Sequence, residues 1–225
     1  MIFTWNITAL DGDPSTEEML LGFDRGRAVR VLILPAWFDE ANKLRRFTVG
    51  VMRRLDAAGI DCFLPDLPGC NESLSPLSEQ TLEGWREAAA VAASTLKTTH
   101  VLAIRAGALI APAALPGWRY APQSGPAVLR GMTRARTIAA REAGISETSE
   151  SLMALGRQEG LMLGGWTIGA AMLRALEKAE PALAPEQQEI AQTDLGGPGL
   201  WLRAEPSQDT AQTDALAAII AGSLT

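Results

Sequence analysis

The sequence predicts an α/β protein in which a mostly parallel sheet is flanked by helices and carries a helical insertion. In the first half of the chain, short apolar runs alternate with longer amphipathic segments, and the connections between them are short. Such an alternation produces right-handed crossovers between parallel strands. At 225 residues, 47% of them hydrophobic and 20% charged, the chain has enough material for one core. We therefore expect a single domain over residues 1–225.

The first part of the chain is expected to form one edge and the beginning of the sheet. Residues 1–24 predict one or two leading strands at an antiparallel edge. Residues 29–34, an apolar run stopped by proline, predict a buried strand. Residues 39–58 repeat apolar positions every three or four residues and predict an amphipathic helix that ends at Gly59. Residues 60–64 predict a second buried strand.

A second helix and a third strand follow in the same order. Ser78 is expected to cap this helix. Its inner face is predicted from apolar residues at helical spacing, namely Leu82, Trp85, Ala89, Ala92 and Leu96. Residues 101–104 predict the third buried strand, and residues 118–121 predict a further one. The three buried strands are expected to be adjacent at the centre of the sheet, because strands covered on both faces are continuously apolar.

The rest of the chain is expected to be mainly helical. Residues 126–141 and 167–178 predict two helices, and residues 210–221 predict a closing helix. Residues 200–204 predict the last strand. We therefore interpret residues 126–195 as a helical cap insertion between two strands of the sheet.

Composition and charge exclude several classes of protein. The chain carries 20 Lys and Arg against 26 Asp and Glu, and this net charge of −6 argues against a surface that binds nucleic acid. No apolar run approaches the ~20 residues that span a bilayer, and the first residues lack the pattern of a signal peptide. Two cysteines and no signal peptide favour a reducing compartment, so we expect a cytoplasmic protein. The single histidine leaves few metal-binding schemes, and we expect no metal and no cofactor.

The third predicted strand leads into a motif that resembles a nucleophile elbow. Residues 103–107 read A-I-R-A-G, where the usual pattern is G-x-S-x-G. Small residues around one central side chain allow a sharp turn from strand to helix. Arg105 occupies the position of the nucleophile, and a guanidinium, always protonated, cannot attack a carbonyl group.

Several motifs in order resemble those of a known family. They are PAWFDEANKLRR (35–46), DLPGCNES (66–73), AIRAGALIA (103–111), WRYAPQSG followed by LRGMTRAR (118–136), and the glycine-containing stretch 160–176. The chain is similar to the α/β-hydrolase superfamily and, more closely, to the second family of hydrolase-like proteins associated with the exosortase A system. The resemblance spans residues 29–205. It implies an α/β-hydrolase-like fold and a context of exopolysaccharide production and protein sorting, while the label of hydrolase rests on fold analogy.

The remaining parts of a Ser-His-acid triad are not evident. A histidine is expected after the last strand, but none follows residue 200, and His100 precedes the third strand at the amino end of the sheet. Glu205 and Asp209 lie where an acid would, but we interpret them as a loop residue and a helix cap. Cys70 has no neighbouring histidine to activate it and Cys62 lies inside a strand, so both are expected to pack. We therefore name no catalytic residue.

A candidate binding cleft is expected at the carboxyl ends of the parallel strands. Helix starts and guanidinium groups together suit a small anionic ligand. Arg105 has an alternative role, which is to pair internally with Asp66, Glu40 or Glu72. The candidate residues are Trp37, Asn42, Arg45, Arg105, Ser124 and Arg130.

Two functions remain open from the sequence. The first is a binding or accessory protein without enzymatic activity, and the absence of a Ser/His pair favours it. The second is a hydrolase of an acyl or glycosyl ester with an unusual mechanism. A further possibility is that a partner supplies catalytic groups at an interface, and both a homo-oligomer and a protein partner stay open. The sequence leaves open the ligand and the oligomeric state.

Overall fold

The computed structural model describes residues 1–7 and 16–224, and its centre is a seven-stranded sheet in the order β1-β2-β4-β3-β5-β6-β9. The strands are β1 (Ile2–Ile7), β2 (Thr16–Phe23), β3 (Arg30–Leu34), β4 (Asp61–Pro65), β5 (His100–Ile104), β6 (Gly117–Tyr120) and β9 (Gln187–Ile190). Strands β4, β3, β5, β6 and β9 run parallel, and β1 and β2 form an antiparallel edge. The prediction of a mostly parallel sheet with a leading antiparallel edge is confirmed.

The three strands predicted from apolar runs are neighbours at the centre of the sheet, as expected. Their side chains alternate between two cores, one on each face. On β3, Leu32 and Leu34 pack into one core and Val31 and Ile33 into the other, and none of the four is exposed. This burial on both faces explains why the sequence shows continuous apolar runs.

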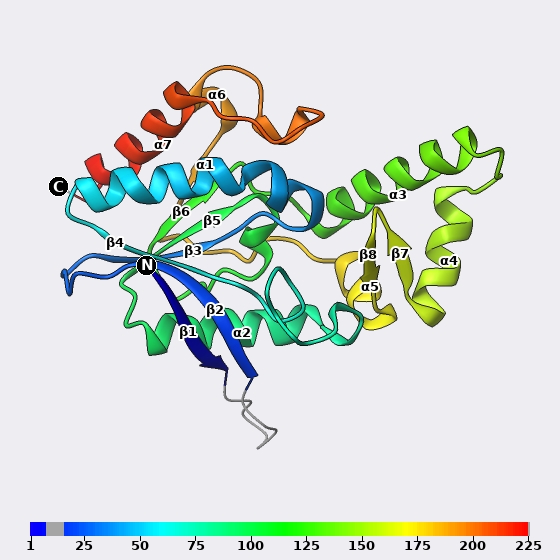
Figure 1. Ribbon diagram of the computed structural model, residues 1–225, viewed down its shortest axis with the longest axis horizontal. Helices are drawn as coiled ribbons and strands as arrows, with labels where there is room; N and C mark the ends of the chain where they lie inside the picture. The colour runs from blue at the N-terminus through cyan, green and yellow to red at the C-terminus, as the bar shows by residue number, and fades with distance from the viewer. Residues whose placement is uncertain (8–15, 225) are drawn as a thin grey trace.

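Helices cover both faces of the sheet (Figure 1). Helices α1 (Phe38–Ala57) and α7 (Thr210–Gly222) lie on one face with the short helix α6 (Gln192–Leu195), and α2 (Leu82–Thr95) lies on the other. The expected cap of α2 at Ser78 is wrong. Thr81 accepts a hydrogen bond from the backbone N–H of Gly84 and caps the helix, while Ser78 lies in a separate 3₁₀ turn (Leu77–Glu79).

Residues 121–186, here called the inserted segment, lie between β6 and β9. They contain α3 (Gly125–Glu142), α4 (Ser149–Glu159), β7 (Leu161–Leu163), β8 (Trp166–Ile168) and α5 (Ala170–Leu176). The helices stand beyond the carboxyl ends of the central strands (Figure 1). The helix expected over 167–178 is partly wrong, because its first residues form the β7–β8 hairpin. Gly164 and Gly165, with φ of 58° and 88°, make the tight turn that this hairpin requires.

The last strand of the sheet is β9, and residues 200–204 are not a strand. The insertion expected to end at residue 195 therefore ends earlier, before β9. Leu200–Leu202 form a 3₁₀ turn in which Leu200 is buried and Leu202 is 73% exposed. Strand β9 is exposed at two of its four positions because it is the edge of the sheet. Within the described residues, no helix has the length and apolar character needed to cross a membrane.

Candidate functional site

The elbow after β5 is a sharp, strained turn. Arg105 has a φ of +55°, a conformation that is uncommon for a residue other than glycine. The turn continues as one short 3₁₀ segment (Arg105–Leu109). It presses so closely on β3 that a Cβ atom at Gly107 would lie 2.5 Å from the carbonyl oxygen of Leu34. The geometry of a nucleophile elbow is therefore present, with an arginine at its tip.

Arg105 is held by three different groups. Its Nε and Nη2 atoms donate to the carboxylate of Glu40 at 2.8 and 3.1 Å, and its Nη1 donates to the carbonyl oxygen of Ala121 at 2.8 Å. The guanidinium also stacks on Trp201, 3.9 Å from the ring centroid. The Arg105 side chain is 12% exposed and that of Glu40 is 23% exposed. Of the three carboxylates considered from the sequence, Glu40 is the one that pairs with Arg105.

No histidine accompanies the elbow. His100 lies at the other end of β5, where it stacks on Trp118 and its Nδ1 lies 2.8 Å from the hydroxyl of Thr99. Burial lowers the pKa of His100. Asp209 caps α7 by accepting from the backbone N–H of Gln212, which matches the expected role as a helix cap, and Glu205 is exposed. The described residues thus contain no histidine placed to activate a nucleophile at position 105.

The two cysteines are not activated. Burial, and after it the charges of Asp66 and Glu18, raise the pKa of Cys70 to about 12. Cys62 lies in the core with a pKa of about 12, raised first by burial. Both thiols are protonated near neutral pH and are poor nucleophiles. Within the described residues, no group of three or more His, Cys, Asp or Glu side chains is arranged to hold a metal ion.

A largely apolar cavity of about 430 Å³ lies between the inserted segment and the body of the protein. The start of α1 and the elbow form its floor, and α3 and the β7–β8 hairpin form its roof. We call it the apolar cavity. Its main lining side chains are Trp37, Phe38, Val128, Met132, Leu163, Trp166 and Trp201. Glu40 and Ala106 also reach its wall, so the ion pair at the elbow borders the apolar cavity.

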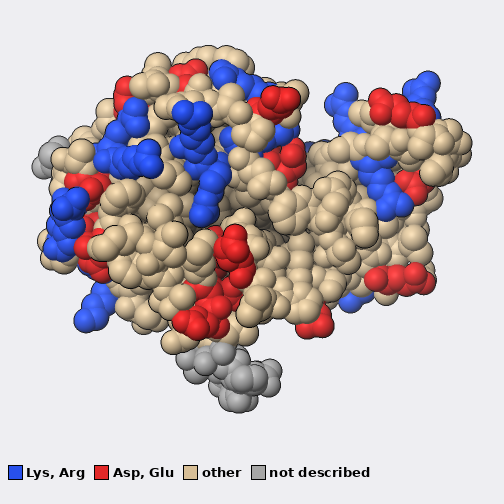
Figure 2. Space-filling model, in the orientation of Figure 1, with Lys and Arg blue, Asp and Glu red and all other residues tan. Residues whose placement is uncertain are grey.

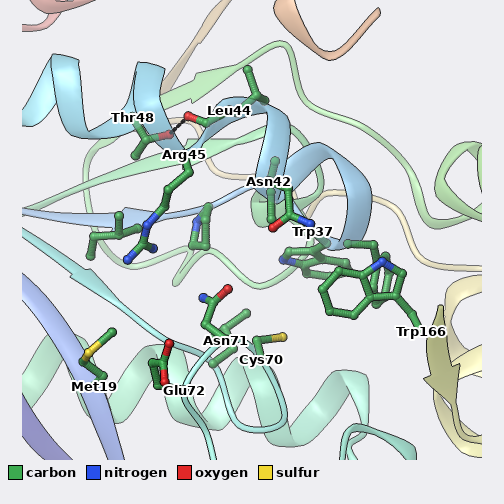
Figure 3. A pocket seen from close by; sticks show the side chains of 16 residues that line it. Met19, Trp37, Asn42, Leu44, Arg45, Thr48, Cys70, Asn71, Glu72 and Trp166 are labelled. Atoms are coloured by element: carbon green, nitrogen blue, oxygen red, sulfur yellow. Dashed lines mark hydrogen bonds between the residues drawn. The ribbon is translucent and has the colours of Figure 1, made fainter. Parts of the chain in front are cut away.

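A second, smaller pocket of about 190 Å³ lies between α1 and the loop that follows β4. We call it the polar pocket. Trp37, Asn42 and Arg45 face Asn71 and Glu72 across it (Figure 3). On the surface, basic side chains gather over α1 and acidic side chains lie below them, with a hollow between (Figure 2). Trp37, Phe38 and Trp166 line both cavities and form their common wall.

Two buried carboxyl groups lie beside the polar pocket. Asp66 accepts a hydrogen bond from the side chain of Asn71 at 2.6 Å, and Arg45 approaches it at 3.6 Å. Glu18 accepts one from Ser73 at 2.9 Å. Burial raises the pKa of both carboxyl groups, and the charge of Asp66 raises that of Glu18 further. The second oxygen of each group has no hydrogen-bond partner among the described residues.

The structure brings only part of the predicted cleft together. Trp37, Asn42 and Arg45 share the polar pocket, and Trp37 also lines the apolar cavity. The remaining three predicted residues, Arg105, Ser124 and Arg130, line neither. Ser124 precedes α3 without a capping hydrogen bond from its side chain, and Arg130 is exposed on that helix.

Backbone strain marks Arg105 and several residues that were not candidates from the sequence. Non-glycine residues with positive φ among the described residues are Phe38, Asn71, Lys97, Arg105 and Ala121. All except Lys97 line one of the two cavities or belong to the elbow and its hydrogen bonds. Strained residues of this kind cluster at functional sites. Asn71 and Glu72 belong to the motif DLPGCNES, which was the only feature of the sequence that pointed to the far wall of the polar pocket.

Comparison with solved structures shows which fold this is. Alpha/beta hydrolase domain-containing protein 10 from mouse has a TM-score of 0.57 at 12% identity, over 100% of this chain and 98% of that one. The esterase domain of a Rhodothermus marinus protein has a TM-score of 0.56 at 13% identity, over 99% and 97%. The chain has the α/β-hydrolase fold, and at these identities the likeness concerns the fold alone. No model of a known protein family matches the sequence, and no curated protein matches it.

We predict that Gly107→Ala destabilises the protein because the new methyl group meets the backbone of β3, which cannot move aside. The expected loss is about 1–3 kcal/mol in the free energy of unfolding, measured by urea denaturation. Gly131→Ala is the matched control, because nothing lies within 4 Å of the added methyl group on α3. The control should be neutral or slightly stabilising, since alanine favours a helix. Equal effects of the two changes would contradict the close packing of the elbow.

Proposed function

We propose that this protein binds a small molecule in the apolar cavity and acts as a binding or accessory protein without hydrolase activity. The observation that carries this proposal is the position of Arg105 and its pairing with Glu40. A side chain that cannot act as a nucleophile occupies the tip of the elbow, and Glu40 holds it in a two-pronged ion pair.

The same ion pair explains how an apolar cavity can border the elbow. An unpaired charge next to apolar side chains is costly, on the order of several kcal/mol. Because Arg105 and Glu40 neutralise each other, the cavity wall near them presents an aromatic ring, Trp201, and the small side chain of Ala106. A cavity of about 430 Å³ with mostly apolar walls has the character of a site for a small organic molecule.

The context of this binding function is proposed from the sequence motifs. Their order supports a role beside the exosortase A system, in exopolysaccharide production and protein sorting. The low cysteine count supports a cytoplasmic location. In the structure, residues of DLPGCNES and PAWFDEANKLRR lie on the facing walls of the polar pocket. Two motifs distant in the sequence thus contribute to one site.

We predict that a fluorophosphonate probe labels no serine of the protein, because the elbow has no hydroxyl and no histidine lies near it. Arg105→Ser should remain unlabelled and inactive toward acyl esters, since the histidine is still missing. Gel fluorescence or intact-protein mass spectrometry measures labelling, with a known serine esterase as the positive control. Stoichiometric labelling of one serine in the unmodified protein would overturn the proposal in favour of the hydrolase alternative.

We predict that a neutral apolar dye, N-phenyl-1-naphthylamine, binds in the apolar cavity and is detected by its fluorescence. Ala135 lies on the cavity wall, so Ala135→Phe should fill part of the space and weaken binding by about tenfold or more. Ala139→Phe is the matched control, because Ala139 is exposed on the same helix α3 and does not line the cavity. Unchanged binding in Ala135→Phe, or an equal loss in both variants, would contradict a site in this cavity.

A further inference from the structure

The polar pocket contains a hydrogen-bond donor that lacks an acceptor. The Trp37 side chain lines this pocket, the residue is only 5% exposed, and its indole N–H has no partner among the described residues. In Figure 3 the indole nitrogen faces the hollow of the pocket. A buried polar group without a partner costs about 1–3 kcal/mol, so a ligand that supplies an acceptor at this point recovers a hydrogen bond.

Further donors face the same hollow. The Arg45 guanidinium forms no hydrogen bond among the described residues, and its charged neighbour is Asp66 at 3.6 Å. This separation is longer than the 2.7–2.9 Å of a charge-assisted hydrogen bond. The side-chain amide of Asn42 also lines the pocket and is exposed at its mouth. An indole N–H, a guanidinium and an amide therefore belong to the walls of one pocket.

The neighbouring acidic groups do not supply the acceptor that these donors lack. Asp66 lies 3.6 Å from Arg45, beyond hydrogen-bond distance, and Asn71 already donates to the Asp66 oxygen nearest that arginine. Glu72 lies on the pocket wall but is exposed, so water screens its charge. Arg45 thus retains capacity for an anionic partner.

The rest of the wall is apolar and limits the ligand. Met19, Leu64 and Leu67 line the pocket together with Phe38 and Trp166. Its volume of about 190 Å³ corresponds to that of about six water molecules in the liquid. The ligand therefore has one oxyanionic end for the donors and a small apolar body for these walls.

We propose that the polar pocket binds a small carboxylate with an apolar body, in which the carboxylate oxygens accept from Arg45 and from the indole N–H of Trp37. This site is separate from the apolar cavity and does not depend on the absence of hydrolase activity. Its three common-wall residues place it beside that cavity, but the donors face the polar pocket.

The test is isothermal titration calorimetry of the full chain with sodium benzoate and with benzamide, a neutral molecule of the same shape. We expect benzoate to bind at least about tenfold more tightly, because only the carboxylate gains charge-assisted bonds. Arg45→Met should weaken benzoate binding by about tenfold or more, and Trp37→Phe should weaken it severalfold while the aromatic wall is retained. Arg46→Met is the matched control and should change nothing, because Arg46 is exposed on α1 and does not line the pocket.

Three results would overturn the proposal. They are the absence of benzoate binding, equal affinity for benzoate and benzamide, and an equal loss in the Arg45 and Arg46 variants. If Arg45→Met does not fold, the comparison of benzoate with benzamide on the unmodified protein decides the question. Competition with N-phenyl-1-naphthylamine separates the two sites: we expect the dye to keep its affinity in saturating benzoate, and competitive displacement would place the carboxylate in the apolar cavity instead.

Discussion

The ion pair between Arg105 and Glu40 is the interaction on which the carboxyl edge of this sheet depends. Arg105 follows β5 and Glu40 lies in the first turn of α1, so the pair ties the central strand to the helix that covers it. The same guanidinium reaches the carbonyl oxygen of Ala121 after β6 and the ring of Trp201 near the end of the chain. Four segments distant in the sequence thus meet at one side chain.

This arrangement carries a cost that the ion pair helps to offset. A positive φ at a residue other than glycine costs on the order of 1–3 kcal/mol, and Arg105 and Ala121 both adopt it. The α/β-hydrolase fold places a nucleophile at such a strained elbow so that its reactive atom stands free. Here the side chain at that position is bound on several sides. The elbow has the sharp turn of this fold, and its side chain is part of the framework around a cavity.

The sequence predicted the parts of the fold that depend on local burial. The three central strands were predictable because both of their faces are covered, which gives continuous apolar runs. Helix α1 was predictable because one of its faces is covered, which gives apolar residues at every third or fourth position. Strand β9 was missed because an edge strand with two exposed positions carries no apolar run. The β7–β8 hairpin was missed because its two strands have three residues each, too few to show a period.

The candidate site was predictable only where one segment supplied it. Trp37, Asn42 and Arg45 come from a single helix start, so their proximity follows from helix geometry. The partner of Arg105 was narrowed to three carboxylates but not chosen, because the choice depends on the path of α1 relative to the elbow. Trp201 had no signal, since its place depends on a 3₁₀ turn where a strand was expected.

A double-mutant cycle on Arg105 and Glu40 tests the central claim most directly. The free energies of unfolding would be measured by urea denaturation for the unmodified protein, Arg105→Met, Glu40→Gln and the variant with both changes. Both side chains are mostly buried, and their hydrogen bonds are charge-assisted, so we expect a coupling energy of about 1–3 kcal/mol. A coupling energy below about 0.3 kcal/mol, within the additivity expected of independent sites, would show that the two side chains do not hold each other and would contradict this account.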